Sequence, residues 1–355
     1  MDTLPIPDLR DENILRAVCD VRPCRTGGFR LEADTLKTSD GGVGGIPLVH
    51  NYGHGGCGVT LGWGTAERAA DLTEQALGVP GSAHPSHVLV LGGGVVGLTT
   101  AHELLTRGHR VTVLAKQFAT DTTSNVAGAL WLPTGIDFPE PGPKRDDFNQ
   151  ILRNAHARFT TLDPERWGVE TLPVYEPEST PYFPEFFESG AIARPEPLDR
   201  LPFPGEPIAG RVFRTLFIHT PRFLNVLRGE VESHGGRLET REFTSLGDIA
   251  DEADARGAHA VVNCLGLGSG ELIQDAALYP ARGVLVHAKP IALGYVFHNG
   301  YNYVFPRSDV LVLGGCFQPG RTDTEPDQPM IDEILTKQRA IFEPRRLAAE
   351  GAKAN

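Results

Sequence analysis

The sequence predicts an α/β protein with a parallel sheet flanked by helices and a second, mainly antiparallel domain. Two observations carry this prediction. A strand, a glycine-rich turn, a helix and another strand follow one another over residues 87–116, and a second apolar strand ending in glycines lies within residues 258–272. Residues 137–214 are rich in proline and aromatic side chains, which indicates strands and loops of another domain. A chain of 355 residues is long enough for two domains.

Composition excludes several classes of protein. A net charge of −12 argues against a nucleic-acid-binding surface, because phosphate contacts need clustered lysine and arginine. No apolar run reaches the roughly 20 residues of a membrane span, and the N-terminus lacks the pattern of a secretory signal. The five cysteines have no metal-type spacing. We therefore expect a soluble, intracellular protein without a protein-bound metal.

The strand–turn–helix unit is the most specific motif. A β-branched strand, His87–Leu91, precedes a G-x-G-x-x-G turn, and apolar residues then repeat at helical spacing until Gly108. Arg110–Leu114 supplies the next strand. The turn comprises Gly92, Gly94, Val95, Val96 and Gly97. Glycines there allow a tight turn, close approach of a pyrophosphate and close packing of the helix, whose N-terminus attracts the phosphates. This is the pattern of a Rossmann-like dinucleotide site.

One expected part of that site is missing. An acidic residue usually binds the adenosine ribose about 20 residues after the turn. Lys116 stands there, between Ala115 and Gln117. Either backbone or a water binds the ribose, or the adenine end is held more loosely than usual.

Two further segments favour FAD over a nicotinamide cofactor. Residues 120–133 read TDTTSNVAGALWLP, a hydroxyl-rich loop followed by small residues, where a nicotinamide enzyme more often continues with another helix and strand. The apolar strand Ala260–Asn263 ends in a second glycine turn. An FAD spanning both halves of the protein requires such a turn, although a purely structural turn remains the alternative.

The motifs together resemble the D-amino-acid oxidase family. They are GGGVVG, VAGALWLP, VVNCLG, ARGVLV, YVFP with VLVLGGCFQ, and HNYGHGG. Members of this family are FAD-dependent enzymes of a wider fold that includes glycine and sarcosine oxidases. In the family the nucleotide turn opens the chain and HNYGHGG closes it. Here residues 1–80 resemble the C-terminal portion, placed in front, so the sequence predicts a circular permutant in which residues 78–87, GVPGSAHPSH, link the two old ends.

The resemblance divides the chain into two discontinuous domains. Residues 45–80, 87–135 and 215–280 are expected to bind FAD. Residues 1–44, 136–214 and 281–355 are expected to form the substrate-binding domain. Within the FAD-binding part, the pattern predicts an amphipathic helix over Phe217–His234, with Thr220 and Pro221 as its cap and first turn.

The resemblance also assigns site residues. Arg22, in an R-P-x-R pattern, matches the arginine that binds the substrate carboxylate, and Tyr303 matches a tyrosine that shares this carboxylate. Gly56 would direct its carbonyl to the substrate amino group. The family's second active-site tyrosine falls at Asn299, which leaves the lid of the pocket open to question. The cofactor contacts comprise the G-x-G-x-x-G residues together with Gly58, Val59, Thr60, Lys116, Thr123, Ser124, Gly128, Ala129, Leu130, Phe243, Cys264 and Gly266.

The expected reaction is oxidation of a neutral D-amino acid by O₂ to an imino acid and H₂O₂. Leu130 and Leu132 would form an apolar wall, and Phe317 stands where members that act on acidic substrates have a basic residue. The alternatives are an oxidase of glycine, sarcosine or D-aspartate, and a flavin-binding permutant with little activity. His50, His54 and Cys57 are expected to be packing residues. A homodimer is compatible with the resemblance, as are peroxisomal and cytoplasmic locations, although the ending GAKAN is no peroxisomal address.

Overall fold

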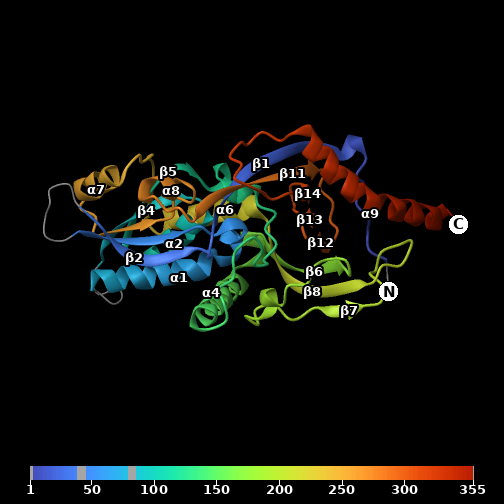
Figure 1. The fold of residues 1–355 in the computed structure, drawn as a ribbon, viewed down its shortest axis with the longest axis horizontal. Coiled ribbons are helices and arrows are strands. Elements are labelled where there is room, and N and C mark those ends of the chain that lie inside the picture. The colour runs from blue at the N-terminus through green and yellow to red at the C-terminus, as the bar shows by residue number, and fades with distance from the viewer. Residues whose placement is uncertain (1–2, 38–44, 79–84, 355) are drawn as a thin grey trace.

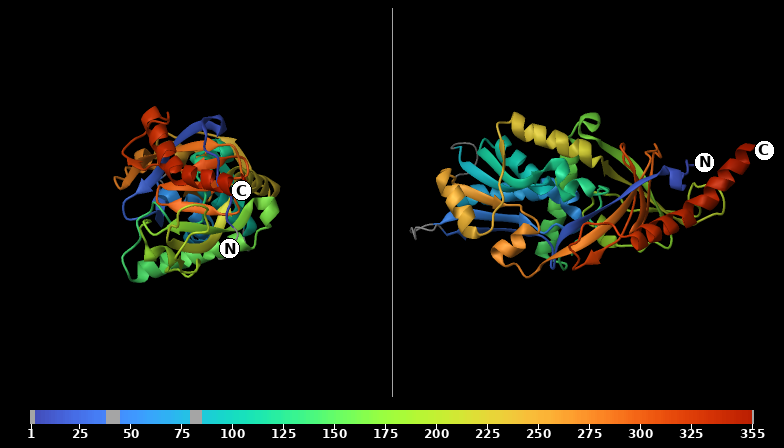
Figure 2. Two further views of the ribbon diagram at one scale, coloured as in Figure 1. Left: turned by 90° about the vertical axis from the view of Figure 1, so that its right-hand side faces the viewer. Right: turned by 90° about the horizontal axis from the view of Figure 1, so that it is seen from above.

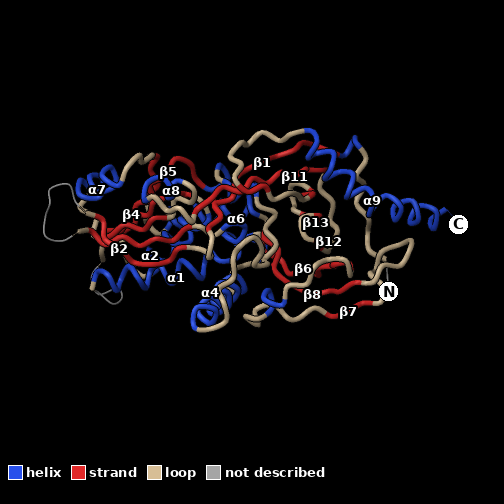
Figure 3. The backbone as a smooth tube through the Cα atoms, in the orientation of Figure 1, coloured by secondary structure: helices blue, strands red, loops and turns tan. Residues whose placement is uncertain are grey.

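The computed structural model describes residues 3–37, 45–78 and 85–354. Two β-sheets lie at opposite ends of an elongated molecule, a six-stranded sheet with its helices on the left of Figure 1 and a nine-stranded sheet on the right. Figure 3 shows the strands in these two groups, with α1, α2 and α7 beside the first group. No helix among the described residues is long and apolar enough to cross a membrane.

The six-stranded sheet assembles strands from distant parts of the chain. From β3 to β9 all pairs are parallel, and β2 adds an antiparallel edge. In spatial order the strands are β2 (Arg30–Leu36), β3 (Ile46–Tyr52), β10 (Ala260–Asn263), β4 (His87–Gly93), β5 (Arg110–Phe118) and β9 (Arg237–Thr240). Helices cover both faces of a parallel sheet, so its central strands are apolar throughout. Val88, Leu89, Val90 and Leu91 are accordingly all fully buried.

Several helices lie in the described part of this half. They are α1 (Gly58–Leu77), α2 (Val95–Thr106), α3 (Thr123–Val126), α6 (Thr220–Ser233), α7 (Leu246–Ala255) and α8 (Gly268–Ile273). Gly78 ends α1 in the left-handed conformation, with φ +66°. Helix α1 packs against α2, so residues 58–77 lie beside the helix that begins within the dinucleotide motif.

The nine-stranded sheet is mainly antiparallel and forms the other half. Its spatial order is β1 (Ile14–Arg25), β11 (Leu278–Ala288), β14 (Leu311–Leu313), β13 (Asn302–Pro306), β12 (Val296–Asn299), β6 (Val169–Pro177), β8 (Gly210–Ile218) and β7 (Glu196–Leu198), and β15 (Gln318–Pro319) pairs with β11. The long helix α9 (Gln328–Ala354) packs against β11, β13 and β14 and runs to the C-terminal end, as both views in Figure 2 show. The described residues also form four short 3₁₀ turns, η1 (Asp11–Asn13), η2 (Gly55–Cys57), η3 (Ala119–Asp121) and η4 (Pro184–Phe187).

The structure corrects the expectation of strands and loops alone in residues 137–214. This segment contains α4 (Pro143–Thr160) and α5 (Pro164–Trp167) besides β6 and β7. Proline is favourable in the first turn of a helix, where its missing N–H has no partner to lose. The buried residues Phe148, Ile151, Leu152, Ala155 and Phe159 then repeat at helical spacing. The proline-rich composition had hidden this periodicity.

Two boundaries also differ from the prediction, and a predicted linker lies partly outside the described residues. Phe217 belongs to β8, and the helix predicted over Phe217–His234 begins at Thr220. Strand β2 pairs along its length with β3, so residues 30–36 belong to the six-stranded sheet although the predicted division placed them in the substrate-binding domain. Of the predicted linker 78–87, residues 79–84 lie outside the described part of the chain.

A close contact between α1 and α4 yields a first prediction. A Cβ on Gly64 would lie 2.2 Å from the carbonyl oxygen of Ile151, a backbone atom that cannot rotate away. We expect Gly64→Ala to lower the free energy of unfolding by about 1–3 kcal/mol. A Cβ on Gly229 in α6 would meet no atom within 4 Å, so Gly229→Ala should raise stability by up to about 1 kcal/mol. Urea denaturation measures both, and equal effects would contradict the tight α1–α4 contact.

Candidate active site

A cavity of about 970 Å³ lies between the two sheets. Its lining includes the turn after β4, the loop before α1, residues 122–138, the turn after β10 and the facing ends of β1, β11 and β13. The cavity therefore joins the segments predicted to bind the cofactor to those predicted to bind the substrate. It is lined by all the predicted site residues except Phe243.

Phe243 is packed elsewhere. It is 9% exposed and belongs to a core cluster with Leu91 and Leu114. The residue follows β9, the last strand of the sheet, where an aromatic ring is buried against the sheet without reaching the cavity. Its assignment as a cofactor contact has no support from the described contacts.

Steric constraints explain the glycines of the dinucleotide turn. Gly92 has φ +115°, and a Cβ there would lie 2.3 Å from the carbonyl oxygen of Cys264. A Cβ on Gly97 would lie 1.9 Å from the carbonyl oxygen of Gly92. Helix α2 can therefore begin directly against the turn, and the turn against the end of β10. At the start of this helix the Val95 N–H donates to Ser124 Oγ at 3.0 Å.

The adenine end of the site contains no acid from β5. Lys116 lines the cavity edge, and its side chain is 69% exposed and pairs with Glu242 at 3.1 Å. An exposed pair of this kind contributes little stability. The neighbouring Ala115 and Gln117 also line the cavity. The Ala115 carbonyl already accepts from the Arg241 N–H at 3.0 Å, so binding of a ribose by other backbone groups stays a prediction.

The glycine-rich loop before α1 lies directly on another backbone segment. A Cβ on Gly55 would lie 2.2 Å from the carbonyl oxygen of Gly135, and the Gly56 N–H donates to that same oxygen at 3.2 Å. Gly53 and Gly55 both have positive φ. These contacts turn the chain so that α1 begins at Gly58 with its N-terminus at the cavity, where Gly58, Val59 and Thr60 line the wall.

His54 and Cys57 are buried packing residues in this loop, as expected. His54 stacks on Phe29 with ring centroids 5.3 Å apart, and its Nε2 lies 3.1 Å from Thr65 Oγ1. Burial lowers the pKa of His54 to about 3, so the ring is neutral at physiological pH. Burial likewise raises the pKa of the Cys57 thiol, which donates to the Thr134 carbonyl.

His50, the other histidine near this loop, is also buried. Its Nδ1 lies 3.3 Å from Asn263 Nδ2, and its Nε2 lies 3.5 Å from Asp34 Oδ2. Burial lowers the pKa of His50. His50 does not line the cavity, and neither does Asn263 or Asp34, so these contacts do not connect His50 to the site.

In the substrate half, Gly283 of β11 and two glycines directly after β14, Gly314 and Gly315, form a floor for two long side chains. A Cβ on Gly314 would lie 2.0 Å from Tyr303 Cζ, and one on Gly283 would lie 2.5 Å from the guanidinium nitrogens of Arg22. The Tyr303 hydroxyl lies 3.3 Å from the corresponding position on Gly315. Both long side chains therefore lie across the sheet where these glycines leave room. Sequence reasoning had not given these glycines a role.

Arg22 presents a guanidinium without a carboxylate partner. Its Nη1 donates to the Cys316 carbonyl at 3.2 Å, and its Cζ lies 6.0 Å from the centre of the Phe317 ring. Within residues 3–37, 45–78 and 85–354, no ion pair to Arg22 is formed. A cation that lines a cavity and is not neutralised by the protein is suited to an anionic ligand.

Tyr303 is the second polar group beside this guanidinium. Its ring stacks on Phe305 with centroids 4.1 Å apart. Burial raises the pKa of Tyr303 to about 12, against the opposing influence of Arg22. The phenol therefore remains a neutral hydrogen-bond donor at physiological pH.

The opposite wall is apolar, and the mouth of the cavity is partly aromatic. Leu130 and Leu132 line the cavity as expected. Tyr301 is 50% exposed and stacks on Phe317 at 5.9 Å. Asn299, which replaces the family tyrosine, accepts a hydrogen bond from Thr180 Oγ1 at 2.9 Å and so ties β12 to residues 180–187 at the cavity.

A row of polar side chains on the nine-stranded sheet was missed by the sequence analysis. Glu176 Oε2 accepts from Arg211 Nε at 2.5 Å, and Glu176 Oε1 accepts from His298 Nδ1 at 2.6 Å. His298 lies directly opposite Tyr303 in the β12–β13 pair, so both face the same side of the sheet. All four residues line the cavity. Only the pairing of strands brings them together, and no local pattern could have revealed it.

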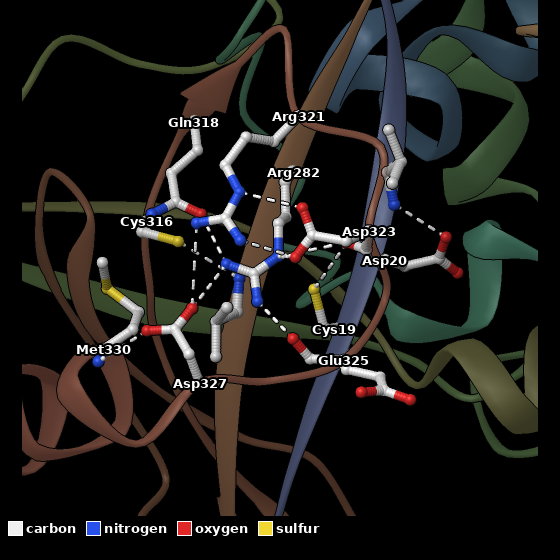
Figure 4. A network of polar contacts seen from close by, with 12 residues as sticks. Cys19, Asp20, Arg282, Cys316, Gln318, Arg321, Asp323, Glu325, Asp327 and Met330 are labelled. Carbon is white, nitrogen blue, oxygen red and sulfur yellow. Dashed lines mark hydrogen bonds and ion pairs between the residues drawn. The ribbon is translucent and has the colours of Figure 1, made fainter.

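A buried arginine on β11 supports the site from outside (Figure 4). Arg282 is fully buried and donates to Gln318 Oε1 at 2.6 Å and to Asp327 Oδ2 at 2.8 Å. It also pairs with Asp323 at 3.0 Å and donates to the Glu325 carbonyl. These bonds hold the segment that begins at Cys316, whose carbonyl contacts Arg22.

Comparison with known families decides the class of protein. A family profile described as FAD dependent oxidoreductase matches residues 87–353. The chain belongs to the FAD-dependent oxidoreductases. The match begins at the first residue of β4 and covers both glycine turns.

The relatives of this FAD-dependent oxidoreductase include two D-amino-acid oxidases and a D-aspartate oxidase. The chain is 33% identical over 270 residues to a D-amino-acid oxidase from Rubrobacter xylanophilus, covering 73% of this chain and 78% of the relative. It is 30% identical over 280 residues to a D-amino-acid oxidase from Streptomyces coelicolor, covering 72% and 77%. It is 28% identical over 263 residues to human D-aspartate oxidase, covering 71% and 74%.

Solved structures support the fold of the FAD-dependent oxidoreductase. Glycine oxidase from Bacillus cereus superposes with a TM-score of 0.54 over 74% of this chain and 80% of that chain, at 17% identity. Glycine oxidase from Geobacillus kaustophilus superposes with a TM-score of 0.51 over 75% and 80%, at 18% identity.

The residues present fit FAD. Gly92, Gly94 and Gly97 leave space that a Cβ would fill, and the N-termini of α1 and α2 both reach the cavity. The cavity continues from these glycines to Leu130 and Arg22, as a cofactor with a dinucleotide end and a reactive ring requires. Apart from Phe243, the residues predicted to contact the cofactor all line this cavity.

The contact between Gly97 and Gly92 yields a second prediction. Gly97→Ala forces the start of α2 away from the turn, because the obstructing atom is a backbone oxygen. We expect the Kd for FAD to rise at least about tenfold. Val96→Ala shortens a neighbouring side chain without a backbone clash and should retain FAD. Fluorescence titration of the apoprotein with FAD measures both, and unchanged affinity in the first variant would contradict the packing described.

Proposed function

We propose that this FAD-dependent oxidoreductase oxidises neutral D-amino acids. The amino acid loses two electrons and two protons to become an imino acid, O₂ is reduced to H₂O₂, and water converts the imino acid to a 2-oxo acid and ammonia. When bound, FAD supplies the two-electron acceptor for the α-hydrogen. The observation that carries the proposal is the unneutralised guanidinium of Arg22 beside the Tyr303 phenol in a cavity that also reaches the cofactor turn.

Arg22 and Tyr303 would bind the substrate carboxylate. A guanidinium offers two parallel N–H donors to a carboxylate, and a neutral phenol adds a third donor. The glycine floor formed by Gly283, Gly314 and Gly315 keeps both side chains flat against the sheet. Substrate can then lie above them without displacing protein atoms.

The loop before α1 would complete the site. We assign the Gly56 carbonyl to the substrate amino group, following the family pattern. The N-terminus of α1 at Gly58 would favour negative charge that develops on the cofactor side, by roughly 0.5–2 kcal/mol. His54 is neutral and bonded to Thr65, and His50 does not line the cavity, so neither is suited to remove a proton. Positioning is therefore the protein's main contribution.

Charge on the cavity wall favours a neutral substrate side chain. Phe317 and the two leucines are apolar, and Arg211 is neutralised by Glu176. A D-aspartate-type substrate would need a second cation that is free of a protein partner. The human D-aspartate oxidase is a relative, but the paired state of Arg211 gives that alternative less support.

We further propose that the chain is a circular permutant. The family match starts at His87, yet residues 46–77 supply β3 to the same sheet as β4 and β10, and α1, which packs against β3. The N-terminal segment and α9 meet, since Arg339 Nη2 lies 2.6 Å from Asp11 Oδ1 and Tyr295 of the same lobe donates to the Pro5 carbonyl. Chain ends that lie on one lobe are compatible with a cut there.

The first experiment is an anaerobic absorption titration of the FAD-loaded protein with D-alanine and L-alanine. Bleaching of the flavin spectrum by the D-form alone supports the proposal. A flavin spectrum that neither form nor a wider panel of D-amino acids changes would overturn it. Bleaching by glycine or D-aspartate alone would move the assignment to the corresponding alternative.

The proposed role of Arg22, a half-buried residue, yields a third prediction. Arg22→Lys keeps a positive charge but loses the paired donors, so kcat/KM for D-alanine should fall about 100-fold. The flavin spectrum should be unchanged. Arg16→Lys, at an exposed position of the same strand, should leave kcat/KM as it is. Equal activity in Arg22→Lys and wild type would exclude Arg22 as the carboxylate ligand.

The polar row yields a fourth prediction about substrate preference. His298 donates from Nδ1 to Glu176, and in the neutral ring Nε2 is then an acceptor; in the described part of the chain Nε2 has no partner. A substrate amide should bind it better than an isosteric alkyl group. We expect His298→Leu to lower the ratio of kcat/KM for D-asparagine to that for D-leucine about tenfold. His298→Gln should restore part of the ratio, and a constant ratio would contradict this placement.

A further inference from the structure

A second group of ligand-type side chains lies away from the cavity. The group consists of His102 on α2, Glu230 on α6 and His234 at the C-terminal end of α6. Their possible ligand atoms all lie within 4.8 Å of one another. None of the three residues lines the cavity. We propose that His102, Glu230 and His234 form a binding site for a divalent transition-metal ion.

Helix geometry brings the three groups together. Glu230 and His234 are four residues apart and so lie on one face of α6, and α2 packs against that helix. Donor atoms around a tetrahedral Zn²⁺ are about 3.3 Å apart, given metal–ligand distances near 2.0–2.1 Å. The His234 side chain is 41% exposed, so a metal ion bound there need not disturb the core.

His102 has a buried nitrogen that the protein does not satisfy. The residue is 4% exposed, and its Nδ1 has no hydrogen-bond partner among the described residues. Its ring meets Trp63 edge-on at 5.2 Å and lies 5.3 Å from the ring of His234. Leaving such an atom unpaired usually costs about 1–3 kcal/mol.

The other two ligands already have outer partners that orient them. His234 Nδ1 donates to the Glu230 backbone carbonyl at 2.8 Å, so Nε2 carries the free lone pair. Metal-binding histidines commonly donate their second nitrogen to a carbonyl in this way. Glu230 Oε1 accepts from Arg166, which leaves Oε2 available on the side of His234, 3.9 Å from its Nδ1.

The ligand set selects the class of metal. Two imidazoles and one carboxylate suit Zn²⁺, Ni²⁺ or Cu²⁺, whereas Mg²⁺ and Ca²⁺ prefer oxygen ligands alone. A bound ion would join the end of α6 to α2, the helix that begins at the dinucleotide turn. We therefore expect the metal to stabilise the fold rather than to take part in oxidation.

Isothermal titration of the FAD-loaded, chelator-treated full chain with Zn²⁺ tests the site. We expect one ion per chain, and a Tm several degrees higher in excess Zn²⁺ than in chelator. His234→Ala changes an exposed side chain and should fold normally while its affinity for Zn²⁺ falls at least about tenfold. Glu232→Gln, also on the surface of α6, is the matched control and should bind Zn²⁺ like wild type.

Two outcomes would overturn the proposal. One is the absence of saturable Zn²⁺ binding to the wild-type chain, and the other is equal binding by His234→Ala and wild type. His102→Gln provides a second variant if a further ligand must be removed, because it retains a polar group of moderate size in the same space. Loss of the Zn²⁺-dependent rise in Tm in this variant would support His102 as a ligand, and an unchanged rise would count against it.

Discussion

The register of the antiparallel pair between β1 and β11 is the constraint on which the site depends. This ladder pairs Arg22 with Ala281 and Asp20 with Gly283, and it runs from the nine-stranded sheet toward the cavity. Side chains alternate between the faces of a strand, so a shift of one residue would turn Arg22 away from the cavity. The register thus decides which arginine faces a ligand.

Two arginines on this ladder illustrate the consequence. Arg22 faces the cavity and has no carboxylate partner among the described residues, whereas Arg282 is fully buried and has partners on Gln318, Asp323 and Asp327. Burial of a guanidinium is costly unless its donors are bonded, which the second residue achieves within the protein. The first is bonded to the Cys316 carbonyl and has no carboxylate partner among the described residues. One strand pair therefore separates a structural cation from the cation proposed to bind the substrate.

The cofactor half depends on contacts between distant segments in a similar way. The turn at Gly92 lies against Cys264, and the loop at Gly55 lies against Gly135, in each case at distances that exclude a Cβ. Glycine density in the sequence signals that a backbone will approach closely, but it does not identify the partner. Parallel pairing of β3, β10 and β4 supplies those partners, because it aligns the ends of strands that are far apart along the chain.

The sequence by itself determined two local units, the strand–turn–helix at residues 87–116 and the strand Ala260–Asn263, and by resemblance it predicted Arg22 and Tyr303 as site residues. The period of the apolar residues, the positions of glycines and the order of motifs are properties of the sequence itself, so they can be recognised without the tertiary structure. Only the tertiary structure decided that Phe243 is packed in the core, that β2 joins the six-stranded sheet, and that Arg211, Glu176 and His298 form a row beside Tyr303. Strand pairing makes these contacts, and its partners are distant in sequence. Helix α4 was missed for a different reason, because prolines at its start concealed a helical period that burial against α1 stabilises.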